Sequence, residues 1–457
     1  MSRIIIIGAG PGGYETAVAA AKKGFEVTIV SDGNVGGVCL NEGCIPTKAL
    51  CRNAEILESL HRGAEFGLEG LSYNLDFKKV MERKDAVVSQ LRSGVEFLLG
   101  GKGITLLRGK ASFSGQKKVS VALTDGGVQE VEGDYVIVAT GSVSAMLPIP
   151  GKDAEGVITS REILELQEVP KRLCVIGGGV IGLEFASVFN AFGSEVSVVE
   201  YFPNILPRFD TDLSKRLKQA LGKKGISIET GAAVSAIEKT TGGLAVKYTR
   251  KDKEYCIEAD KVLMAVGRRP NISSMNFADA GVETTPKGIP VDGNMRTNVP
   301  WIYAIGDITG GMMLAHTATF QGIRALTAIC KAEGIEASDD IDFSITPAAV
   351  FTSPEAATVG LSEDECVQKG LQVKCLKSFF RANGKALALG EPEGFCKIVV
   401  GAGDGRILGC HLFGAHSADL VQEMSAIMKL GATVKDVRSM IHAHPTLSEV
   451  LQAAFNE

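Results

Sequence analysis

Two stretches of the chain repeat one pattern of apolar and polar positions. In the first, the apolar run 3–7 predicts a strand buried on both faces, small residues to Lys23 predict a helix, and 27–30 predicts a second strand. In the second, strands are predicted at 173–176 and 196–199. The chain therefore contains an internal duplication of a strand–helix–strand unit.

Glycines follow the first strand of each unit in the pattern G-x-G-x-x-G. In this fingerprint, bare backbone amides at a helix N-terminus bind a pyrophosphate. The motif alone is weak, but here each copy is flanked by a strand, a helix and a strand of suitable length. The sequence thus predicts two dinucleotide sites. The glycines are Gly8, Gly10 and Gly13 in the first copy, and Gly177, Gly179 and Gly182 in the second.

An acidic residue that binds ribose is expected at the end of the second strand of each unit. Glu200 stands there in the second copy, and the nearest arginine that follows is Arg208, which favours NAD over NADP. The first copy has Ser31 at this place, followed by Asp32. Either Asp32 binds the ribose hydroxyls, or Ser31 makes a weaker contact.

Three further strands end in a glycine turn. The segments 134–141 and 262–270 contain Gly141 and Gly267, and a later segment ends in Gly306–Asp307. An aspartate at such a strand end accepts hydrogen bonds from the polyol chain of a cofactor, although alone it is more often a turn residue.

The remaining pattern predicts ordinary helices and strands. After a Ser/Asp-rich joint at 337–340 there is no further phosphate loop, which indicates an α+β domain. The predicted fold class is α/β, with two Rossmann-like dinucleotide-binding domains and a C-terminal α+β domain. Helices are expected at 45–60, 77–99 and 419–429, a β-meander at 103–132, and strands at 395–400 and 407–413.

Composition narrows the functional class. A length of 457 residues predicts two to four domains, and 45% hydrophobic with 22% charged residues is ordinary for a soluble protein. The net charge of −5 is not that of a basic nucleic-acid-binding protein. No apolar run is long enough to span a bilayer. We therefore expect neither a nucleic-acid nor a membrane partner.

Cysteine usage points to a reducing compartment. Ten cysteines scattered over the chain do not resemble a secreted disulfide framework. The first strand begins by Arg3, so no signal or transit peptide is expected, and the predicted location is cytoplasmic. Eight cysteines are interpreted as small buried or half-buried hydrophobic residues: Cys51, Cys174, Cys256, Cys330, Cys366, Cys375, Cys396 and Cys410.

The other two cysteines, Cys39 and Cys44, lie in the glycine-rich stretch G-G-V-C-L-N-E-G-C-I-P-T-K at 36–48. On a helical turn they approach closely enough for a disulfide. So small a loop stabilises the fold little, which favours a bond that is made and broken. Lys48, one turn beyond, would make a thiolate more reactive. On spacing alone, two buried and unpaired thiols are as good an interpretation as a disulfide. A zinc site fits less well, because further ligands are missing.

The tail I-H-A-H-P-T-L-S-E at 441–449 contains a candidate acid–base catalyst. Glu449 is placed to hold one imidazole nitrogen of His444, which suits thiol chemistry. The alternative is a histidine without a catalytic role, at a polar helix N-terminus, whose ring nitrogens simply have hydrogen-bond partners. His442 and His444 together suggest a metal pair, but no third ligand is evident, and no metal site is predicted. No partner is visible for His61, His411 and His416.

Together these motifs closely resemble the pyridine nucleotide-disulfide oxidoreductases, over essentially the whole chain and in the family's order. Within that family the resemblance is to the dihydrolipoamide dehydrogenases, flavoproteins of 2-oxo acid dehydrogenase complexes. It implies oxidation of protein-bound dihydrolipoyl groups, with electrons passing through a Cys39–Cys44 disulfide and FAD to NAD⁺. The implied partners are a lipoyl-bearing acyltransferase or a glycine cleavage H-type protein.

The resemblance also assigns roles to residues. Cys39 would meet the substrate and Cys44 would lie beside the flavin. His444, held by Glu449, would act as acid–base catalyst from the partner subunit, so that the homodimer shares its active sites. The first three glycines and Asp307 would bind FAD, and the second three glycines with Glu200 would bind NAD. Lys48 would lie near the flavin and pair with Glu184. Further cofactor contacts are expected from Asp32, Gly141, Gly267 and Ala315.

The implied domains are a first FAD-binding part at 1–142, an NAD-binding domain at 143–264, a second FAD-binding or central part at 265–338, and a dimerisation domain at 339–457. Three residues depart from the family's pattern. Ser31 replaces the usual acid, Thr317 stands where many relatives have Lys, and Gly311 replaces a common Pro before Met312.

Two alternatives remain. One is another disulfide reductase of the same fold. Glutathione and trypanothione reductases tend to need basic residues after the second fingerprint, and a mercuric reductase would carry a cysteine pair at the C-terminus; both features are missing here. The other is a non-catalytic flavin- or nucleotide-binding scaffold, which has no need of Cys39, Cys44, His444 and Glu449 together.

Overall fold

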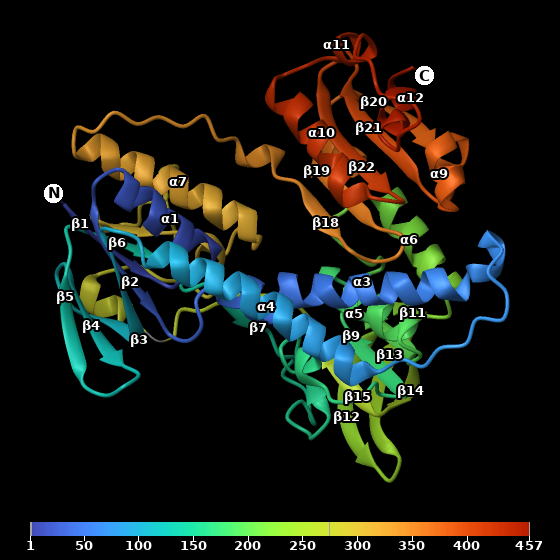
Figure 1. The fold of residues 1–457 in the computed structure, drawn as a ribbon, viewed down its shortest axis with the longest axis horizontal. Helices are drawn as coiled ribbons and strands as arrows, with labels where there is room; N and C mark the ends of the chain where they lie inside the picture. Colours follow the sequence, from blue (N-terminus) through green and yellow to red (C-terminus); the bar gives the residue numbers. More distant parts are fainter. Residues whose placement is uncertain (1, 274, 457) are drawn as a thin grey trace. The chain divides into compact units, whose positions relative to one another are not determined.

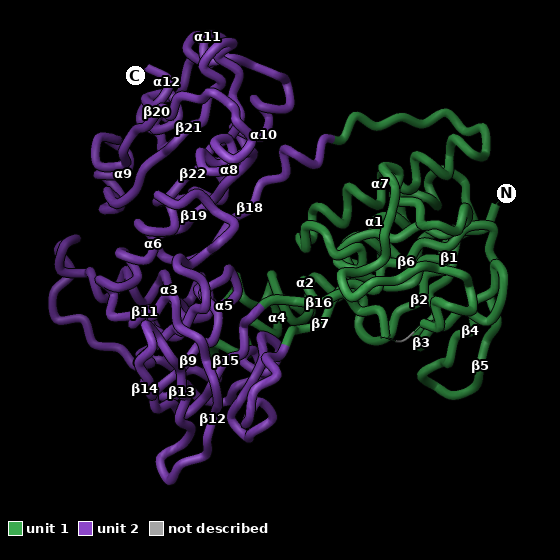
Figure 2. The backbone as a smooth tube through the Cα atoms, turned by 180° about the vertical axis from the view of Figure 1, so that it is seen from behind, with its two compact units in different colours: residues 1–49, 79–145, 267–341 green, residues 50–78, 146–266, 342–457 purple. Residues whose placement is uncertain are grey.

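The computed structural model describes residues 2–273 and 275–456 (Figure 1). The chain divides into two compact units, and each is interleaved along the sequence (Figure 2). Unit 1 comprises residues 1–49, 79–145 and 267–341, and unit 2 comprises residues 50–78, 146–266 and 342–457.

Unit 1 is built on a seven-stranded sheet in the order β17-β6-β1-β2-β3-β4-β5. The first five strands pair in parallel, and the last pairs are antiparallel. The long strand β3 belongs to both parts, so the predicted meander continues the dinucleotide sheet. The strands are β1 (Arg3–Ile7), β2 (Glu26–Ser31), β3 (Ile104–Gly115), β4 (Lys118–Leu123), β5 (Val128–Glu132), β6 (Tyr135–Val138) and β17 (Ile302–Ala304).

Two helices of unit 1, α1 (Pro11–Lys22) and α7 (Ala315–Ala332), lie side by side (Figure 1). Glycines allow their close approach, because a Cβ on Gly322 would lie 1.9 Å from Thr16 Oγ1. Apolar residues such as Ile4, Ile6 and Ile29 are fully buried beneath them. Other elements of this unit are α2 (Gly37–Glu42), β7 (Ser142–Ser144), β16 (Arg268–Pro270), η3 (Phe277–Ala280) and η4 (Gly306–Thr309), and α3 (Cys44–His61) and α4 (Phe77–Leu99) each have part of their length here.

The first half of unit 2 repeats the strand–helix–strand unit, as predicted. Its parallel sheet has the order β11-β10-β9-β15-β8, with β9, α5 and β10 corresponding to β1, α1 and β2. A separate antiparallel sheet is formed by β12, β13 and β14. The elements are β8 (Val157–Ile158), η2 (Glu162–Glu165), β9 (Arg172–Ile176), α5 (Val180–Ala191), β10 (Glu195–Glu200), α6 (Thr211–Lys223), β11 (Ser227–Thr230), β12 (Ala233–Thr240), β13 (Gly243–Arg250), β14 (Lys253–Ala259) and β15 (Lys261–Met264).

The second half of unit 2 is an α+β arrangement around the antiparallel sheet β18-β19-β22-β21-β20. Helix α10 packs over β19 and β22, and α12 packs over β20 and β21. The elements are η5 (Phe343–Ile345), β18 (Ala348–Val350), β19 (Ala356–Gly360), α8 (Glu363–Gln368), β20 (Val373–Phe379), η6 (Phe380–Ala382), α9 (Gly384–Leu389), β21 (Phe395–Gly401), β22 (Ile407–Phe413), α10 (Ser417–Lys429), α11 (Val434–Arg438) and α12 (Glu449–Phe455), with η1 (Gly63–Phe66) also in this unit.

The α/β fold class predicted from the sequence is confirmed, whereas one cysteine differs from expectation. Cys256 is exposed, because it lies on β14, an edge strand of its three-stranded sheet. Cys375 is half-buried, and the other six unpaired cysteines are buried. Among the described helices, none is both long and apolar enough to cross a bilayer.

Candidate active site

The first glycine turn of unit 1 forms a cradle for a phosphate group. Gly8 has φ +110°, and a Cβ there would lie 2.2 Å from the carbonyl oxygen of Ala139. A Cβ on Gly13 would lie 1.9 Å from Gly8 O. Helix α1 begins after Gly10, which has no side chain to cap the free N–H groups of the first turn. These features fit the pyrophosphate of FAD.

The second glycine turn has the same geometry in unit 2. Gly177 has φ +113°, with Ala265 O 2.4 Å from the position of a Cβ, and a Cβ on Gly182 would lie 2.1 Å from Gly177 O. No atom lies within 4 Å of a Cβ on Gly179, the N-cap of α5. The open space before an uncapped helix fits a second pyrophosphate, that of NAD.

Glu200 at the end of β10 organises the loop beside this turn. Its Oε2 accepts a hydrogen bond from Gly178 N at 2.5 Å, and its Oε1 accepts one from Phe202 N at 2.7 Å. The side chain is buried, at 6% exposure. Since each carboxylate oxygen has two lone pairs, both retain acceptor capacity toward a ribose hydroxyl.

In the first copy, the two candidate ribose ligands have different surroundings. Ser31 is buried, and its hydroxyl donates to Gly33 O at 3.1 Å, inside the turn after β2. Asp32 is exposed. The carboxylate of Asp32 is therefore better placed than the Ser31 hydroxyl to meet a ligand.

Asp307, in η4, belongs to a half-buried polar chain that the sequence did not predict. Arg268 Nε donates to Ser142 Oγ at 2.7 Å, and Ser142 Oγ donates to Asp307 Oδ2 at 2.5 Å. Burial lowers the pKa of Arg268, and the nearby Asp307 carboxylate opposes that shift. Ser142 directly follows Gly141, and Arg268 directly follows Gly267. Their position after a predicted turn glycine was the sequence feature that could have marked them as site residues. Both glycines have positive φ and no atom within 4 Å of an added Cβ.

Cys39 and Cys44 form a disulfide with their Cα atoms 4.7 Å apart. Cys39 lies in α2, and Cys44 is the first residue of α3. Gly43 lets the two helices meet, because a Cβ there would lie 3.0 Å from Val38 O and 3.3 Å from Cys39 Cα. Cys44 is exposed and Cys39 is half-buried, so reagents have access to the bond.

The segment between the two cysteines is held by Asn41, which the sequence analysis missed. Asn41 Nδ2 donates to Val35 O at 3.0 Å and to Gly37 O at 2.9 Å. Arg92 Nε, from α4, donates to Asn41 Oδ1 at 2.8 Å. One amide thus fixes α2 against its own entry loop and against a helix remote in sequence.

The predicted histidine–glutamate pair is present in the C-terminal part of unit 2. His444 Nδ1 lies 2.9 Å from Glu449 Oε1, and Thr446 N donates to Glu449 Oε2 at 2.8 Å. The Thr446 amide first, and then His444, lower the pKa of Glu449. An ionised Glu449 accepts a hydrogen bond from Nδ1–H of His444, which leaves Nε2 as the basic atom. The His444 side chain is 79% exposed and accessible to a substrate.

The remaining histidines have partners that the sequence did not show. His442 Nε2 lies 2.7 Å from Glu423 Oε1, so this histidine pairs with α10 rather than joining His444 at a metal site. His411 is buried, with Thr358 Oγ1 2.6 Å from its Nδ1. His416 lies 3.9 Å from Asp419, and His61 packs on the Tyr73 ring at 5.8 Å. Among the described residues, no group of three or more metal-ligating side chains converges.

Lys48 is the fifth residue of α3, and Ala315 is the first residue of α7; both residues lie in unit 1. Glu184, in unit 2, is buried, and its Oε1 accepts a hydrogen bond from Phe351 N at 3.0 Å. The pairing of Lys48 with Glu184 remains a prediction.

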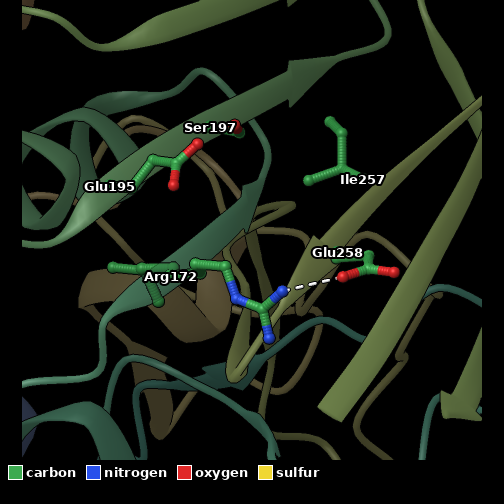
Figure 3. A pocket seen from close by; sticks show the side chains of 6 residues that line it. Arg172, Glu195, Ser197, Ile257 and Glu258 are labelled. Atoms are coloured by element: carbon green, nitrogen blue, oxygen red, sulfur yellow. Dashed lines mark hydrogen bonds and ion pairs between the residues drawn. The ribbon is translucent and has the colours of Figure 1, made fainter. Parts of the chain in front are cut away.

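An open pocket of about 410 Å³ lies in unit 2, at the opposite end of the strands from the glycine turn (Figure 3). Arg172 and Glu195 mark the amino ends of β9 and β10, and Arg172 forms an ion pair with Glu258 at 2.8 Å. Nucleotides bind at the carboxyl ends of such strands. This pocket is therefore not the dinucleotide site.

Family comparisons agree with this geometry. Residues 2–322 match the family described as pyridine nucleotide-disulphide oxidoreductase, and residues 346–455 match the dimerisation domain of that family. The chain belongs to the pyridine nucleotide-disulphide oxidoreductases.

Several curated proteins similar to this chain are named dihydrolipoyl dehydrogenase. The Bacillus subtilis protein is 40% identical over 452 residues, covering 98% of this chain and 95% of the relative. The Chlamydia muridarum protein is 39% identical over 449 residues, covering 98% and 94%.

Solved structures show the same fold. LpdA from Mycobacterium tuberculosis matches with a TM-score of 0.90 at 26% identity, covering 100% of this chain and 99% of that one. The HOCl-induced flavoprotein disulfide reductase RclA from Escherichia coli matches with a TM-score of 0.88 at 28% identity, covering 99% of both chains.

Proposed function

We propose that this protein is a dihydrolipoyl dehydrogenase: it oxidises protein-bound dihydrolipoyl groups and passes the electrons through the Cys39–Cys44 disulfide and FAD to NAD⁺. The observation that carries the proposal is this disulfide, accessible and seated between two short helices, in a chain with two dinucleotide cradles. The relatives named dihydrolipoyl dehydrogenase, at about 40% identity over nearly the whole chain, support the choice of substrate.

Both cofactors fit residues that the structure describes. FAD would be held by the turn containing Gly8, Gly10 and Gly13, with Asp32 toward its ribose and Asp307 toward its polyol chain. NAD would be held by the turn containing Gly177, Gly179 and Gly182, with Glu200 toward its ribose. When bound, FAD supplies the two-electron acceptor that reoxidises the dithiol, and NAD⁺ receives the electrons as hydride.

The chain's own residues carry the sulfur chemistry. His444 Nε2 removes the proton from a dihydrolipoyl thiol, and the thiolate attacks Cys39 Sγ. The Cys39–Cys44 bond breaks, and Cys44 leaves as a thiolate. The second substrate thiol attacks the substrate sulfur of the mixed disulfide, and its proton passes to the departing Cys39 sulfur. The lipoyl disulfide forms, and Cys39 is released as a thiol. Two substrate thiols are oxidised and one protein disulfide is reduced.

The partner assignments follow from the same chemistry. The match to a dimerisation domain supports a homodimer, in which His444 of the partner subunit would serve the dithiol. The lipoyl groups would come from an acyltransferase of a 2-oxo acid dehydrogenase complex or from an H-type protein of glycine cleavage. We place this activity in the cytoplasm.

The direct test mixes the FAD-loaded protein with dihydrolipoamide and NAD⁺ and follows NADH formation, with NADP⁺ in a parallel arm. We expect rapid NADH formation that is lost in Cys44→Ser, and little reaction with NADP⁺. Turnover with NADP⁺ alone would overturn the role of Glu200. No turnover with either, despite bound FAD, would overturn the choice of substrate.

The fold of the RclA structure makes a different disulfide substrate the second candidate. In that case the protein would oxidise NADH with a disulfide other than lipoamide, and Cys39→Ser and Cys44→Ser would both abolish the reaction. A panel of disulfides, assayed by NADH consumption, separates the two functions.

A further inference from the structure

The candidate base His444 lies in a segment without regular secondary structure, residues 439–448, which links α11 to α12 (Figure 1). From residue 438 to residue 445, every residue is exposed except His442. The side chain of His442 is only 7% exposed, whereas that of His444 is 79% exposed. Within this stretch, His442 is therefore the residue that packs into the C-terminal part of unit 2.

A single hydrogen bond holds the His442 ring. Its Nε2 lies 2.7 Å from Oε1 of Glu423, on α10. An ionised carboxylate only accepts hydrogen bonds, so Nε2 carries the hydrogen and donates it. The other ring nitrogen, Nδ1, is buried and has no hydrogen-bond partner among the described residues. Loss of Glu423 would therefore leave the ring without a hydrogen bond.

Helix α10 gives this bond a firm support. The helix packs over β19 and β22. Val421 and Met424, on either side of Glu423 in the sequence, are fully buried. The bond between His442 and Glu423 thus ties an exposed segment to a helix that is fixed in the core of the C-terminal part.

Two further hydrogen bonds anchor the segment on either side of His444. Gln452 Nε2 donates to Met440 O at 3.3 Å, and Asn383 Nδ2 donates to Thr446 O at 3.0 Å. The bond at His442 is shorter than either and lies two residues before His444. Without it, residues 441–445 would have to span the gap between these two anchors.

His442 also lies within electrostatic range of the catalytic pair. The Thr446 amide first, and then His444, lower the pKa of Glu449, and His442 makes a smaller contribution in the same direction. The segment therefore carries two histidine–glutamate pairs in succession. The exposed pair presents a base, and the buried pair attaches the backbone beside that base to α10.

We propose that His442 is a positioning residue: its bond to Glu423 fixes the backbone around residues 443–445 and thereby places His444 Nε2 for removal of the substrate thiol proton. The proposal rests on the proposed role of His444 as the base. A general base must lie within hydrogen-bond reach of the proton that it removes, and a displacement of about 1 Å costs roughly a hundredfold in rate. His442 acts through His444, because its own Nδ1 is buried.

The test removes the bond from each side in the full-length, FAD-loaded protein. The variants are His442→Ala, Glu423→Ala and the double variant, with His442→Gln as the conservative replacement. His61→Ala, a histidine elsewhere in unit 2, is the control, and His444→Gln is the reference for loss of the base.

The measured step is reduction of the Cys39–Cys44 disulfide by dihydrolipoamide and, separately, by dithiothreitol. Samples are quenched with iodoacetamide, and the alkylated cysteines are counted by mass spectrometry. Reduction of the flavin by NADH, a step that does not use the base, is followed in parallel, together with the thermal unfolding midpoint.

We expect His442→Ala and Glu423→Ala each to slow reduction of the disulfide about tenfold, less than His444→Gln does. The double variant should be no slower than either single variant, because both substitutions remove the same bond. His442→Gln keeps an N–H donor in place of Nε2 and should keep most of the wild-type rate. Flavin reduction by NADH should not change, nor should any rate in His61→Ala.

A wild-type rate of disulfide reduction in His442→Ala, or losses that multiply in the double variant, would overturn the proposal. So would an equal loss in flavin reduction by NADH, since this would show a general disturbance of the fold. If His442→Ala does not fold, Glu423→Ala tests the same bond from α10.

The dithiothreitol arm separates this proposal from the choice of substrate. Dithiothreitol is a dithiol that carries no lipoyl group. Reaction of the wild-type protein with dithiothreitol but not with dihydrolipoamide would contradict the proposed substrate, and the comparison of the His442 and Glu423 variants would still decide the role of His442.

Discussion

At the scale of single residues, the site depends on a few side chains that fix others in place. Asn41 makes three hydrogen bonds around the dithiol segment. Its amide nitrogen donates two to backbone oxygens, and its amide oxygen accepts the third from Arg92. Ser142 links Arg268 to Asp307 in the same way. These residues do no chemistry themselves, but a misplaced reacting group slows catalysis strongly.

Replacing Asn41 with Ala removes the bonds to Val35 O and Gly37 O and leaves the Arg92 guanidinium without its acceptor. We expect turnover with dihydrolipoamide to fall about ten- to a hundredfold, because Cys39 is no longer held for attack. The KM for NAD⁺ should not change. Stopped-flow reduction of the disulfide by dihydrolipoamide measures the affected step. The control is Asn298→Ala, which removes a comparable amide bond to a backbone oxygen elsewhere in unit 1. A selective change in the KM for NAD⁺ would contradict this role.

Replacing His444 with Gln removes the base and should lower turnover by roughly 10²–10⁴-fold. Glu449→Gln retains the imidazole but removes the charge that orients it, so we expect a smaller loss, about tenfold. Steady-state rates of both variants, with folding checked by thermal unfolding, give the comparison. Equal and small losses in the two variants would argue against His444 as the base.

At the scale of secondary-structure elements, unit 2 contains a buried ion cluster that joins its two halves. Lys397, on β21, is 2% exposed, and its Nζ lies 2.9 Å from Asp210, 3.0 Å from Asp212 and 2.7 Å from Glu363. Asp210 is 1% exposed and caps α6 by accepting from Asp212 N and Leu213 N. A strand of the C-terminal sheet thus holds the start of a helix from the first half of the unit.

Lys397→Met should destabilise the protein by ~3–5 kcal/mol, because the buried Asp210 carboxylate loses its counter-charge. Lys377→Met is the matched control. Its Nζ also lies 2.9 Å from Asp212, but that pair is well exposed, so we expect a loss below ~1 kcal/mol. Denaturant unfolding of both variants tests the difference. Equal losses of unfolding free energy in the two variants would show that the burial of Lys397 does not add to the effect.

The same cluster predicts a dependence of stability on acid. The hydrogen bond from Lys377 first, and then Lys397, lower the pKa of Asp212 to about 2, against burial, which raises it. A lowered pKa means that Asp212 stabilises the fold above its ordinary pKa of 3.8, and that this contribution is lost as the pH falls toward 2. We expect the unfolding midpoints of wild type and Asp212→Asn to differ above pH 4 and to converge in acid.

At the scale of the whole molecule, the chain combines two copies of one strand–helix–strand unit with a C-terminal domain that carries the candidate base. The dithiol lies in unit 1, and His444 lies in unit 2. A homodimer lets each chain contribute residues to the other's site, which the match to a dimerisation domain supports.

Mixed dimers test the shared site. Cys44→Ser and Cys39→Ser homodimers, like His444→Gln homodimers, should be nearly inactive. When Cys44→Ser and His444→Gln chains are unfolded together and refolded in equal amounts, half of the dimers are mixed, and one of their two sites combines both intact residues. Random pairing of a two-chain oligomer then predicts about a quarter of wild-type activity. No recovered activity, with mixed dimers shown by mass spectrometry, would place dithiol and base in one chain.

What the sequence determined is local in the chain. Strands, helices and the glycine turns follow from periodicity and spacing over a few residues, so both nucleotide units were predicted to within two residues. The pairs Cys39–Cys44 and His444–Glu449 are five residues apart, so short-range geometry alone brings their side chains within reach. Spacing alone did not distinguish a disulfide from two separate thiols, and the structure shows the disulfide.

Only the tertiary structure decided which residues distant in sequence meet. Asn41 and Arg92, Ser142 and Asp307, and Lys397 and Asp210 are brought together by packed strands and helices, and no periodic pattern marks such pairs. The exposure of Cys256 at a sheet edge and the burial of the Thr317 hydroxyl also depend on what lies across the fold. Local pattern sets backbone conformation; long-range packing sets burial and partners, and with them the surroundings of the site.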